Sequence, residues 1–259
     1  MAAYSTYENI VADVDDGVVT LTLNEPDKYN PINTETLLDL RRAFDEIQLD
    51  RDIDVVVITG AGEKSFSSGG DIREYAGPSE EHDPVERERQ DLYFDTWQKL
   101  YDLHPVTIAK INGYCVGGGL ILMSYCDLSV SVDDAKFGVP TTDIGQIPGD
   151  GSTYRITQLV GEQKVKELVY TANLIDAEEA YRIGLVNRIT PRDELDAAVG
   201  ELVDAIQDTG RQAVKNSKKA INYSVRAPDL ETAHEHESQL WWEQFATEER
   251  EELVDEFLE

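Results

Sequence analysis

Basic residues are scarce in this sequence. Lys and Arg number 23 against 52 Asp and Glu, which gives a net charge of −29 at pH 7. Such a surface repels nucleic acid and anionic lipid, so we expect neither nucleic acid nor a membrane as a partner. The acidic residues are distributed along the chain rather than gathered in one tail. We interpret this as a halophilic surface, adapted to high salt that screens the repulsion, with an ordinary acidic protein as the alternative.

Cysteine and histidine are scarce as well. Cys115 and Cys126 are too few for a disulfide framework, which fits a reducing compartment. Their apolar surroundings favour buried thiols over a nucleophile. His234 and His236 are two residues apart and would point to different faces of a helix, so we expect no metal site.

Long apolar runs are missing too. None approaches the roughly 18 residues that cross a bilayer. The first residues have neither the basic start nor the apolar stretch of a secretory signal. We therefore expect a cytoplasmic protein.

The pattern of apolar residues predicts an α/β fold. Alternation at residues 9–14 and 18–23 predicts a hairpin, and Asn33 can cap a helix that ends near residue 50. A continuous β-branched run predicts a strand buried on both faces at 54–59. A second buried strand is expected at 106–111 and a third strand at 127–132. Helices are expected at 84–103, after a charged loop at 77–83, and at 120–125. This alternation indicates a parallel sheet.

The last third of the sequence has a different pattern. From residue 151 onward helices predominate, with one short exception at 185–189. We therefore divide the chain into a core at 1–190 and a helical region at 191–259.

Two glycine-rich loops each follow a buried strand. The loop at 60–65 is not a phosphate-binding loop, because Glu63 stands where a Walker motif needs Gly, and Ser65 where a dinucleotide fingerprint needs one. The loops at 66–72 and 112–119 can instead direct backbone N–H groups into a cleft. Two converging N–H groups, one at a helix N-terminus, stabilise negative charge on an oxygen. Two tight turns without a ligand are the alternative reading.

Several segments together resemble the crotonase (enoyl-CoA hydratase/isomerase) superfamily. The similarity extends over nearly the whole chain, and the order and spacing of the segments make it specific. The segments are Asn24-Glu25-Pro26-Asp27-Lys28-Tyr29-Asn30-Pro31, Phe66-Ser67-Ser68-Gly69-Gly70-Asp71-Ile72-Arg73-Glu74, residues 111–119, Cys126-Asp127, residues 135–140, Ile147-Pro148-Gly149, residues 184–187 and residues 243–247. The resemblance implies a spiral of ββα units with a C-terminal helical trimerisation region, assembled as a homotrimer or a dimer of trimers.

The resemblance also implies the site. The Ser68 and Gly118 N–H groups are expected to form the oxyanion hole that holds the carbonyl of an acyl-CoA thioester substrate. Coenzyme A enters as part of the substrate, and no permanently bound cofactor is expected. The residues expected to line its cleft are Lys28, Tyr29, Phe66, Ser68, Gly69, Gly70, Asp71, Ile72 and Gly118. For Asp71 and Asp127 we favour structural hydrogen bonding. The family's last helix often offers a basic residue to the coenzyme A of the neighbouring subunit. The last residues here are Phe257-Leu258-Glu259, so we do not extend the resemblance to that contact.

The chain departs from the family pattern at two catalytic positions. Where the hydratases of the family have two glutamates, this sequence has Ile121 and Thr141. Neither side chain can act as a general acid or base near neutral pH. Asp150 can replace them, because a carboxyl group among apolar residues has a raised pKa. Its alternative role is to cap the helix that begins near residue 151. Asp143 and Glu74 are weaker candidates, and Tyr114 and Tyr125 are expected in the core.

Three functional hypotheses follow. The first is an enzyme of the enoyl-CoA hydratase/isomerase type in which Asp150 moves a proton beside the enolate. The second is an acyl-CoA decarboxylase or thioester hydrolase of the same superfamily. The third, from a different class, is a non-catalytic acyl-CoA-binding protein.

Overall fold

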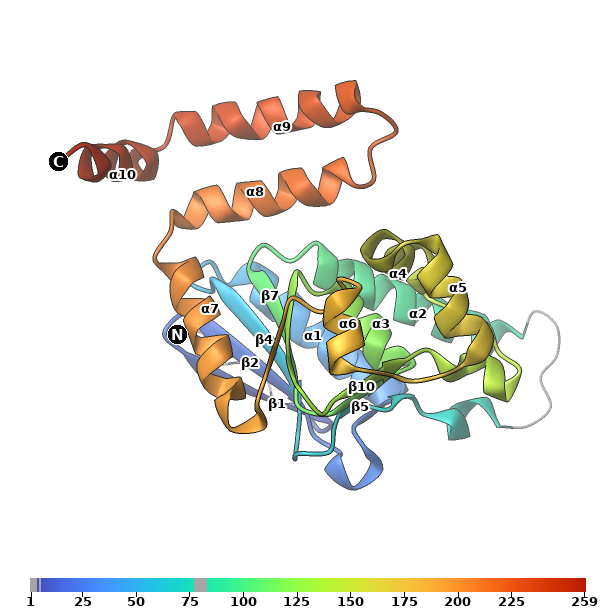
Figure 1. The fold of residues 1–259 in the computed structure, drawn as a ribbon. Helices are drawn as coiled ribbons and strands as arrows, with labels where there is room; N and C mark the ends of the chain where they lie inside the picture. The colour runs from blue at the N-terminus through green and yellow to red at the C-terminus, as the bar shows by residue number, and fades with distance from the viewer. Residues whose placement is uncertain (1–3, 5, 77–82) are drawn as a thin grey trace.

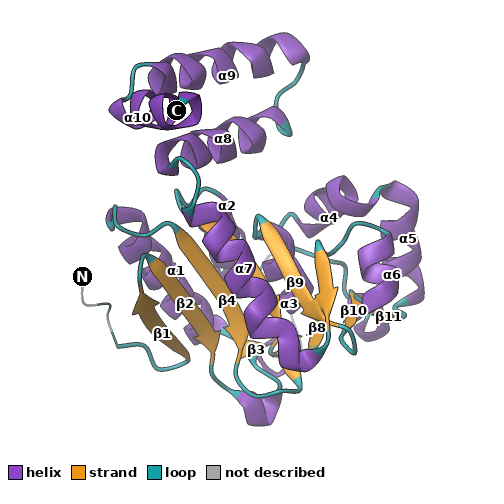
Figure 2. Ribbon diagram, turned by 60° about the vertical axis from the view of Figure 1, so that its left-hand side comes forward, coloured by secondary structure: helices purple, strands orange, loops and turns teal. Residues whose placement is uncertain are grey.

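The centre of the molecule is a six-stranded sheet. The computed structural model describes residues 4, 6–76 and 83–259, so the predicted loop at 77–83 lies outside them except for Asp83. The strands follow the order β1 (Ile10–Asp15), β2 (Val18–Leu23), β4 (Val55–Gly60), β7 (Val106–Ile111), β9 (Leu128–Val132) and β12 (Arg188–Thr190). Only the β1–β2 pair is antiparallel, and the remaining neighbours are parallel (Figure 2). The predicted hairpin and parallel sheet are confirmed.

Short strands beside this sheet bring the two glycine-rich loops together. A four-stranded sheet has the order β11 (Ile175–Asp176), β10 (Lys136–Gly138), β8 (Tyr114–Val116) and β5 (Ser65–Ser67). A two-stranded sheet pairs β3 (Pro31–Ile32) with β6 (Gly69–Gly70) in parallel. Because β5 pairs with β8, the residues after each of these strands lie next to each other.

Helices cover the sheet with apolar faces that the sequence predicts. In α1 (Thr34–Leu49) the side chain of Asn33 accepts a hydrogen bond from Thr36 N, 2.8 Å away, and thus caps the helix. Residues Leu37, Leu40, Phe44 and Ile47 of α1 are buried. Next to α1 lies α2 (Pro84–Tyr101), whose Trp97 is fully buried. The apolar helix α3 (Gly118–Tyr125) is buried along nearly its whole length, which places it inside the molecule.

From residue 151 onward the chain is mainly helical, as predicted, but contains two short strands. After α4 (Ser152–Val160) and α5 (Glu162–Thr171) comes β11, which the sequence did not predict, and then α6 (Ala177–Arg182). The predicted exception at 185–189 corresponds to β12, which begins three residues later. Both strands are too short to show a periodic pattern.

The C-terminal helices differ in how they contact the core. Helix α7 (Leu195–Gln207) buries Leu195, Val199 and Val203 in the main apolar core. By contrast, α8 (Arg211–Ser224), α9 (Leu230–Phe245) and α10 (Glu248–Leu258) form a layer at one end of the molecule (Figure 1). Among the described residues no helix combines the length and apolar character of a membrane span.

Candidate active site

The two glycine-rich loops are in direct backbone contact. Gly69 has φ +93°, and a methyl group placed on its Cα would lie 2.6 Å from Gly118 N. A methyl group on Gly118 would lie 3.0 Å from Gly70 N. Side chains at these positions would force the loops apart, so glycine is required for their close approach. The sequence prediction that these loops meet is confirmed.

The directions of the N–H groups distinguish Ser68 from Gly70. The Ser68 N–H donates to the carbonyl of Tyr29 at 2.9 Å, within the protein. The Asp71 N–H donates to Ile32 O of β3. Successive N–H groups of an extended chain point to opposite sides, so the Gly70 N–H points away from β3 and toward the start of α3. Gly70, rather than Ser68, therefore presents its N–H beside Gly118.

Gly118 is the first residue of α3. The first N–H groups of a helix have no acceptor within it, and the helix dipole adds partial positive charge there. Its neighbour Gly117 donates its own N–H to Gly138 O at 2.9 Å, which fixes the loop just before the helix. The structure thus combines a helix N-terminus with the outward N–H of a neighbouring strand, as an oxyanion-binding site requires.

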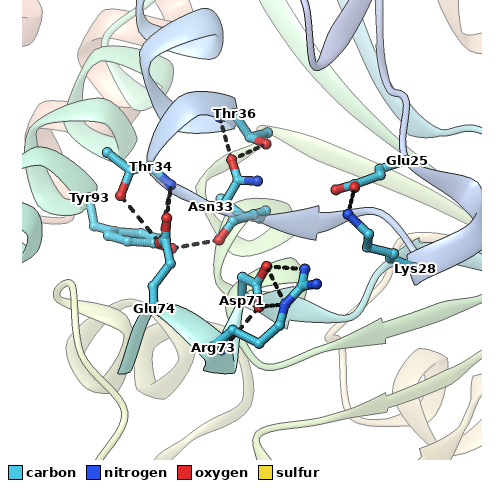
Figure 3. Close-up of polar contacts among 10 residues, drawn as sticks. Glu25, Lys28, Asn33, Thr34, Thr36, Asp71, Arg73, Glu74 and Tyr93 are labelled. Carbon is cyan, nitrogen blue, oxygen red and sulfur yellow. Dashed lines mark hydrogen bonds and ion pairs between the residues drawn. The ribbon is translucent and has the colours of Figure 1, made fainter. Parts of the chain in front are cut away.

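The loop that carries Lys28 and Tyr29 is fixed to the first glycine loop. Tyr29 has a left-handed backbone (φ 65°), and its carbonyl also accepts a hydrogen bond from Ser65 Oγ at 3.1 Å. The Asn30 amide donates to Ser65 O at 2.8 Å. Lys28 is half exposed and forms an ion pair with Glu25 (Figure 3). Both predicted coenzyme A contacts, Lys28 and Tyr29, thus lie beside the Ser68–Gly70 segment.

The remaining residues of the predicted cleft have different surroundings. Phe66 is fully buried, so it supports the loop from the core, whereas Ile72 is 63% exposed. The Asp71 side chain accepts a hydrogen bond from Arg73 N and forms an ion pair with the Arg73 guanidinium (Figure 3). The hydrogen bond from Arg73 lowers the pKa of Asp71. Asp71 therefore has a structural role, as favoured from the sequence.

Asp150 is bonded to α3, and its carboxyl group has a raised pKa. It precedes α4, whose N-cap residue is Gly151 without a side-chain cap bond, so the predicted capping role is wrong. Burial raises the pKa of Asp150 from 3.8 to about 6, because the charged form loses hydration. Its backbone carbonyl accepts a hydrogen bond from the Tyr125 hydroxyl, 2.9 Å away. This bond attaches Asp150 to the C-terminal end of the helix that begins at Gly118.

Ile121 and Thr141 occupy the two positions where the resemblance led us to expect glutamates. Ile121 is buried in α3, one turn after Gly118. Thr141 lies in the 3₁₀ helix Pro140–Ile144, and its buried Oγ1 has no hydrogen-bond partner among the described residues. An unpaired buried hydroxyl is costly. Like Ile121, Thr141 cannot act as a general acid or base near neutral pH.

The weaker candidates have structural explanations or are exposed. Glu74 accepts hydrogen bonds from Thr34 N at 3.1 Å and 3.2 Å, which places it at the start of α1 (Figure 3). Asp143 is exposed. Asp127 Oδ2 accepts from Thr107 N at 2.7 Å and pairs with Lys218, which confirms its structural role. Tyr125 lies in the core as expected, whereas Tyr114 is 45% exposed and packs edge-on against Tyr29.

The two cysteines are buried, and the ring of one histidine packs against a tyrosine. Burial raises the pKa of both the Cys115 and the Cys126 thiol, so both are poor nucleophiles, as expected. The His236 ring packs against Tyr223, with centroids 4.0 Å apart. Within residues 4, 6–76 and 83–259, no group of three or more His, Cys, Asp or Glu side chains could hold a metal ion.

Sequence reasoning missed two features of this site. It chose Ser68 instead of Gly70, although Gly70 already belonged to the expected cleft. The pairing of 69–70 with 31–32 decides which N–H is free, and runs of two residues give no periodic signal. It also missed the bond between Tyr125 and Asp150, which are 25 residues apart.

Comparisons with known proteins agree with this geometry. A family model described as enoyl-CoA hydratase/isomerase matches residues 13–259. A short-chain-enoyl-CoA hydratase from Clostridium acetobutylicum is 35% identical, over 97% of this chain and 95% of that protein. A crotonyl-CoA hydratase from Syntrophomonas wolfei is also 35% identical, over 98% and 96%.

Solved structures extend the similarity to the fold. The crystal structure of an enoyl-CoA hydratase from Bacillus anthracis superposes with a TM-score of 0.91 at 33% identity, covering 96% of each chain. Pseudomonas aeruginosa DspI superposes with a TM-score of 0.93 at 27% identity, covering 99% of this chain and 96% of that one. The α/β architecture is therefore the crotonase fold, as the sequence predicts.

Proposed function

The chain belongs to the enoyl-CoA hydratase/isomerase family, and we propose that it uses Asp150 to move a proton on an acyl-CoA bound at Gly70 and Gly118. The family makes it an acyl-CoA-processing enzyme of the hydratase/isomerase type. The observation that carries the assignment of Asp150 is its half-buried carboxyl group, whose pKa of about 6 makes it an effective base near neutral pH.

In this proposal the thioester carbonyl oxygen accepts hydrogen bonds from the Gly70 and Gly118 N–H groups. These donors stabilise the negative charge that develops on the oxygen when a proton leaves the neighbouring carbon. Gly70 takes the place expected for Ser68, whose N–H is bonded to Tyr29 O. The coenzyme A part contacts the loop of Lys28 and Tyr29 and the backbone of residues 68–72. Coenzyme A is part of the substrate, not a resident cofactor.

The acyl group would extend along α3. Gly118, Ile121 and Tyr125 are spaced three and four residues apart, so they share one face of this helix. Tyr125 lies about 10 Å beyond Gly118 at a rise of 1.5 Å per residue and holds Asp150 there. A single carboxyl group can carry a proton from one carbon of the acyl chain to another. That chemistry is an isomerisation of an enoyl-CoA, and it needs no second glutamate.

The test is deuterium incorporation in wild-type protein, Asp150→Asn and Asp143→Asn. Each is incubated in deuterated water with butyryl-CoA, crotonyl-CoA and 3-hexenoyl-CoA, and mass spectrometry follows deuterium uptake, hydration and isomerisation. Asp143→Asn is the matched control, because it makes the same change on an exposed residue seven positions before Asp150. We expect Asp150→Asn to lose about 10²-fold or more of the exchange, the usual contribution of a general base, while its affinity for coenzyme A stays within twofold.

The other outcomes distinguish the alternatives. Exchange that is equal in wild type and Asp150→Asn would exclude Asp150 as the base. Malonyl-CoA is incubated in the same way. Loss of carbon dioxide from it would favour a decarboxylase, and release of free coenzyme A from any substrate would favour a thioester hydrolase. Binding of butyryl-CoA without exchange or product would indicate a non-catalytic binding protein.

We propose a homotrimer or a dimer of trimers in the cytoplasm. The apolar residues that α9 and α10 expose support assembly, notably Trp241, Trp242 and Phe257.

A further inference from the structure

Asp150 lies in an unusual turn. Both Asp150 (φ 60°) and Gly151 (φ 74°) have a left-handed backbone. This conformation suits Gly151, but it is unfavourable for a residue with a Cβ atom such as Asp150. Such residues keep the conformation only where their surroundings enforce it. The contacts of this turn therefore bear on what holds the half-buried Asp150 in place.

One of these contacts is the Tyr125 hydroxyl. It donates to the Asp150 carbonyl at 2.9 Å, and a methyl group on Gly151 would lie 2.7 Å from the same hydroxyl oxygen. The same methyl group would lie 3.3 Å from the ring of Phe94 in α2. The Tyr125 hydroxyl thus bonds to the Asp150 carbonyl and occupies the space that a side chain at position 151 would need.

Tyr125 is itself held rigidly. It is 3% exposed and packs edge-on against the Tyr101 ring, with centroids 6.2 Å apart. The guanidinium groups of Arg155 and Arg226 lie 4.8 Å and 4.1 Å from the centroid of the Tyr101 ring. Arg155 also donates to Ser124 O at 2.7 Å. Burial raises the pKa of the Tyr125 phenol, so the hydroxyl remains a neutral donor.

We propose that Tyr125 is a positioning residue: its hydroxyl holds Asp150 in the left-handed turn and so keeps the carboxyl group buried for proton transfer. The inference rests on the proposed function, because it gives that role to Asp150. Tyr125 does not exchange the proton itself, since its hydroxyl is bonded to a backbone carbonyl. Its effect on the reaction passes through the conformation of residues 150–151.

The charged groups near the turn do not account for the raised pKa of Asp150. Arg155 of α4 and Arg226, which follows α8, are the cations that act on Tyr125, and Gln98 of α2 is its neutral polar neighbour. For Asp150 the cause of the raised pKa is burial alone. A change that frees the turn should therefore lower this pKa by exposing the carboxyl group to water.

The test compares Tyr125→Phe with Tyr101→Phe. Both remove one phenol oxygen from neighbouring rings, but only the first removes a hydrogen bond to Asp150. The pKa of Asp150 is measured by carbon-13 NMR of aspartate-labelled protein, with Asp150→Asn to assign the signal. Butyryl-CoA exchange in deuterated water gives kcat and KM as functions of pH. Gly151→Ala is a second variant, because its methyl group displaces the hydroxyl.

We expect Tyr125→Phe to lower the pKa of Asp150 from about 6 toward its ordinary value near 4. We also expect kcat to fall about 10- to 100-fold, up to the lower end of what a general base contributes, while KM stays within twofold. Gly151→Ala should have the same effects, and Tyr101→Phe neither. An Asp150 pKa that is unchanged in both Tyr125→Phe and Gly151→Ala would overturn the proposal. If the wild-type protein shows no exchange, the proposed function fails, but the NMR measurement still decides the role of Tyr125.

Discussion

Asp150 combines a half-buried carboxyl group with an unfavourable backbone conformation. The folded chain stabilises its neutral form, since burial raises the pKa to about 6. In the unfolded chain the pKa is near 3.9. A group with a raised pKa stabilises the fold below the unfolded pKa, and this contribution is lost as the pH rises through the folded value. Asp150 therefore destabilises the protein where it is ionised, above pH 6.

Substitution of Asp150 by Asn should remove this pH-dependent penalty. We expect Asp150→Asn to exceed wild type in free energy of unfolding by about 2 kcal/mol at pH 8 and by much less at pH 4, from the two-unit pKa difference reduced for partial exposure. Urea unfolding at pH 4, 6 and 8 measures this difference, and Asp143→Asn is the control. Parallel curves for wild type and Asp150→Asn from pH 4 to pH 8 would show that Asp150 is ionised freely in the fold.

At the residue level, the sequence predicted the kinds of residue in the site better than their contacts. It named Asp150, Gly118 and the segment 66–72 as candidates because these match known motifs or stand in place of missing groups. It could not decide between Ser68 and Gly70, since the direction of a backbone N–H depends on pairing with β3. It also placed Tyr125 only in the core, because aromatic residues on an apolar helix usually belong there.

Prediction of elements succeeded wherever the pattern was long enough. The hairpin β1–β2, helix α1 and strand β7 have the predicted bounds to within about one residue, since apolar periodicity and the Asn33 cap are local signals. The strands β3, β6 and β11 have two residues each. They form only because neighbouring elements supply partners, so no local pattern predicts them.

Helix α8 is fixed to the sheet by a buried ion pair. Lys218 Nζ lies 2.7 Å from Asp127 Oδ2 and donates to Pro105 O, also at 2.7 Å. The same Asp127 oxygen accepts hydrogen bonds from Thr107 N and Thr107 Oγ1. Lys218 is 8% exposed, so the pair is largely shielded from water. This contact joins α8 to the beginnings of β7 and β9.

Loss of Lys218 should therefore loosen α8. We expect Lys218→Met to cost about 3–5 kcal/mol, because it leaves the Asp127 carboxylate without its cation. Lys219→Met, the exposed neighbour, should cost less than about 0.5 kcal/mol. Urea unfolding measures both variants, and the double variant Asp127→Asn/Lys218→Met should recover part of the loss. Equal stability of Lys218→Met and Lys219→Met would mean that the ion pair does not hold α8.

At the scale of the whole molecule, the net charge follows directly from the amino-acid composition. The chain carries 52 acidic and 23 basic residues. Most of the ion pairs lie at the surface, where each contributes little. Exposed acidic residues are dense on α10, whose residues 251–258 are all exposed. Mutual repulsion of these charges opposes the compact state unless salt screens it.

Salt should therefore stabilise this protein. The screening length falls from about 10 Å at 0.1 M salt to about 3 Å at 1 M. We expect the thermal unfolding midpoint to rise by about 10 °C or more between 0.1 M and 2 M KCl, which corresponds to a few kcal/mol for a domain of this size. A variant in which Glu251, Glu252, Asp255 and Glu256 are replaced by their amides lowers the negative charge by four. Its midpoint should be higher than that of wild type at 0.1 M KCl and should rise less with salt. A wild-type midpoint that is equal at both salt concentrations would show that repulsion does not limit stability, and the acidic surface would then not be a halophilic adaptation.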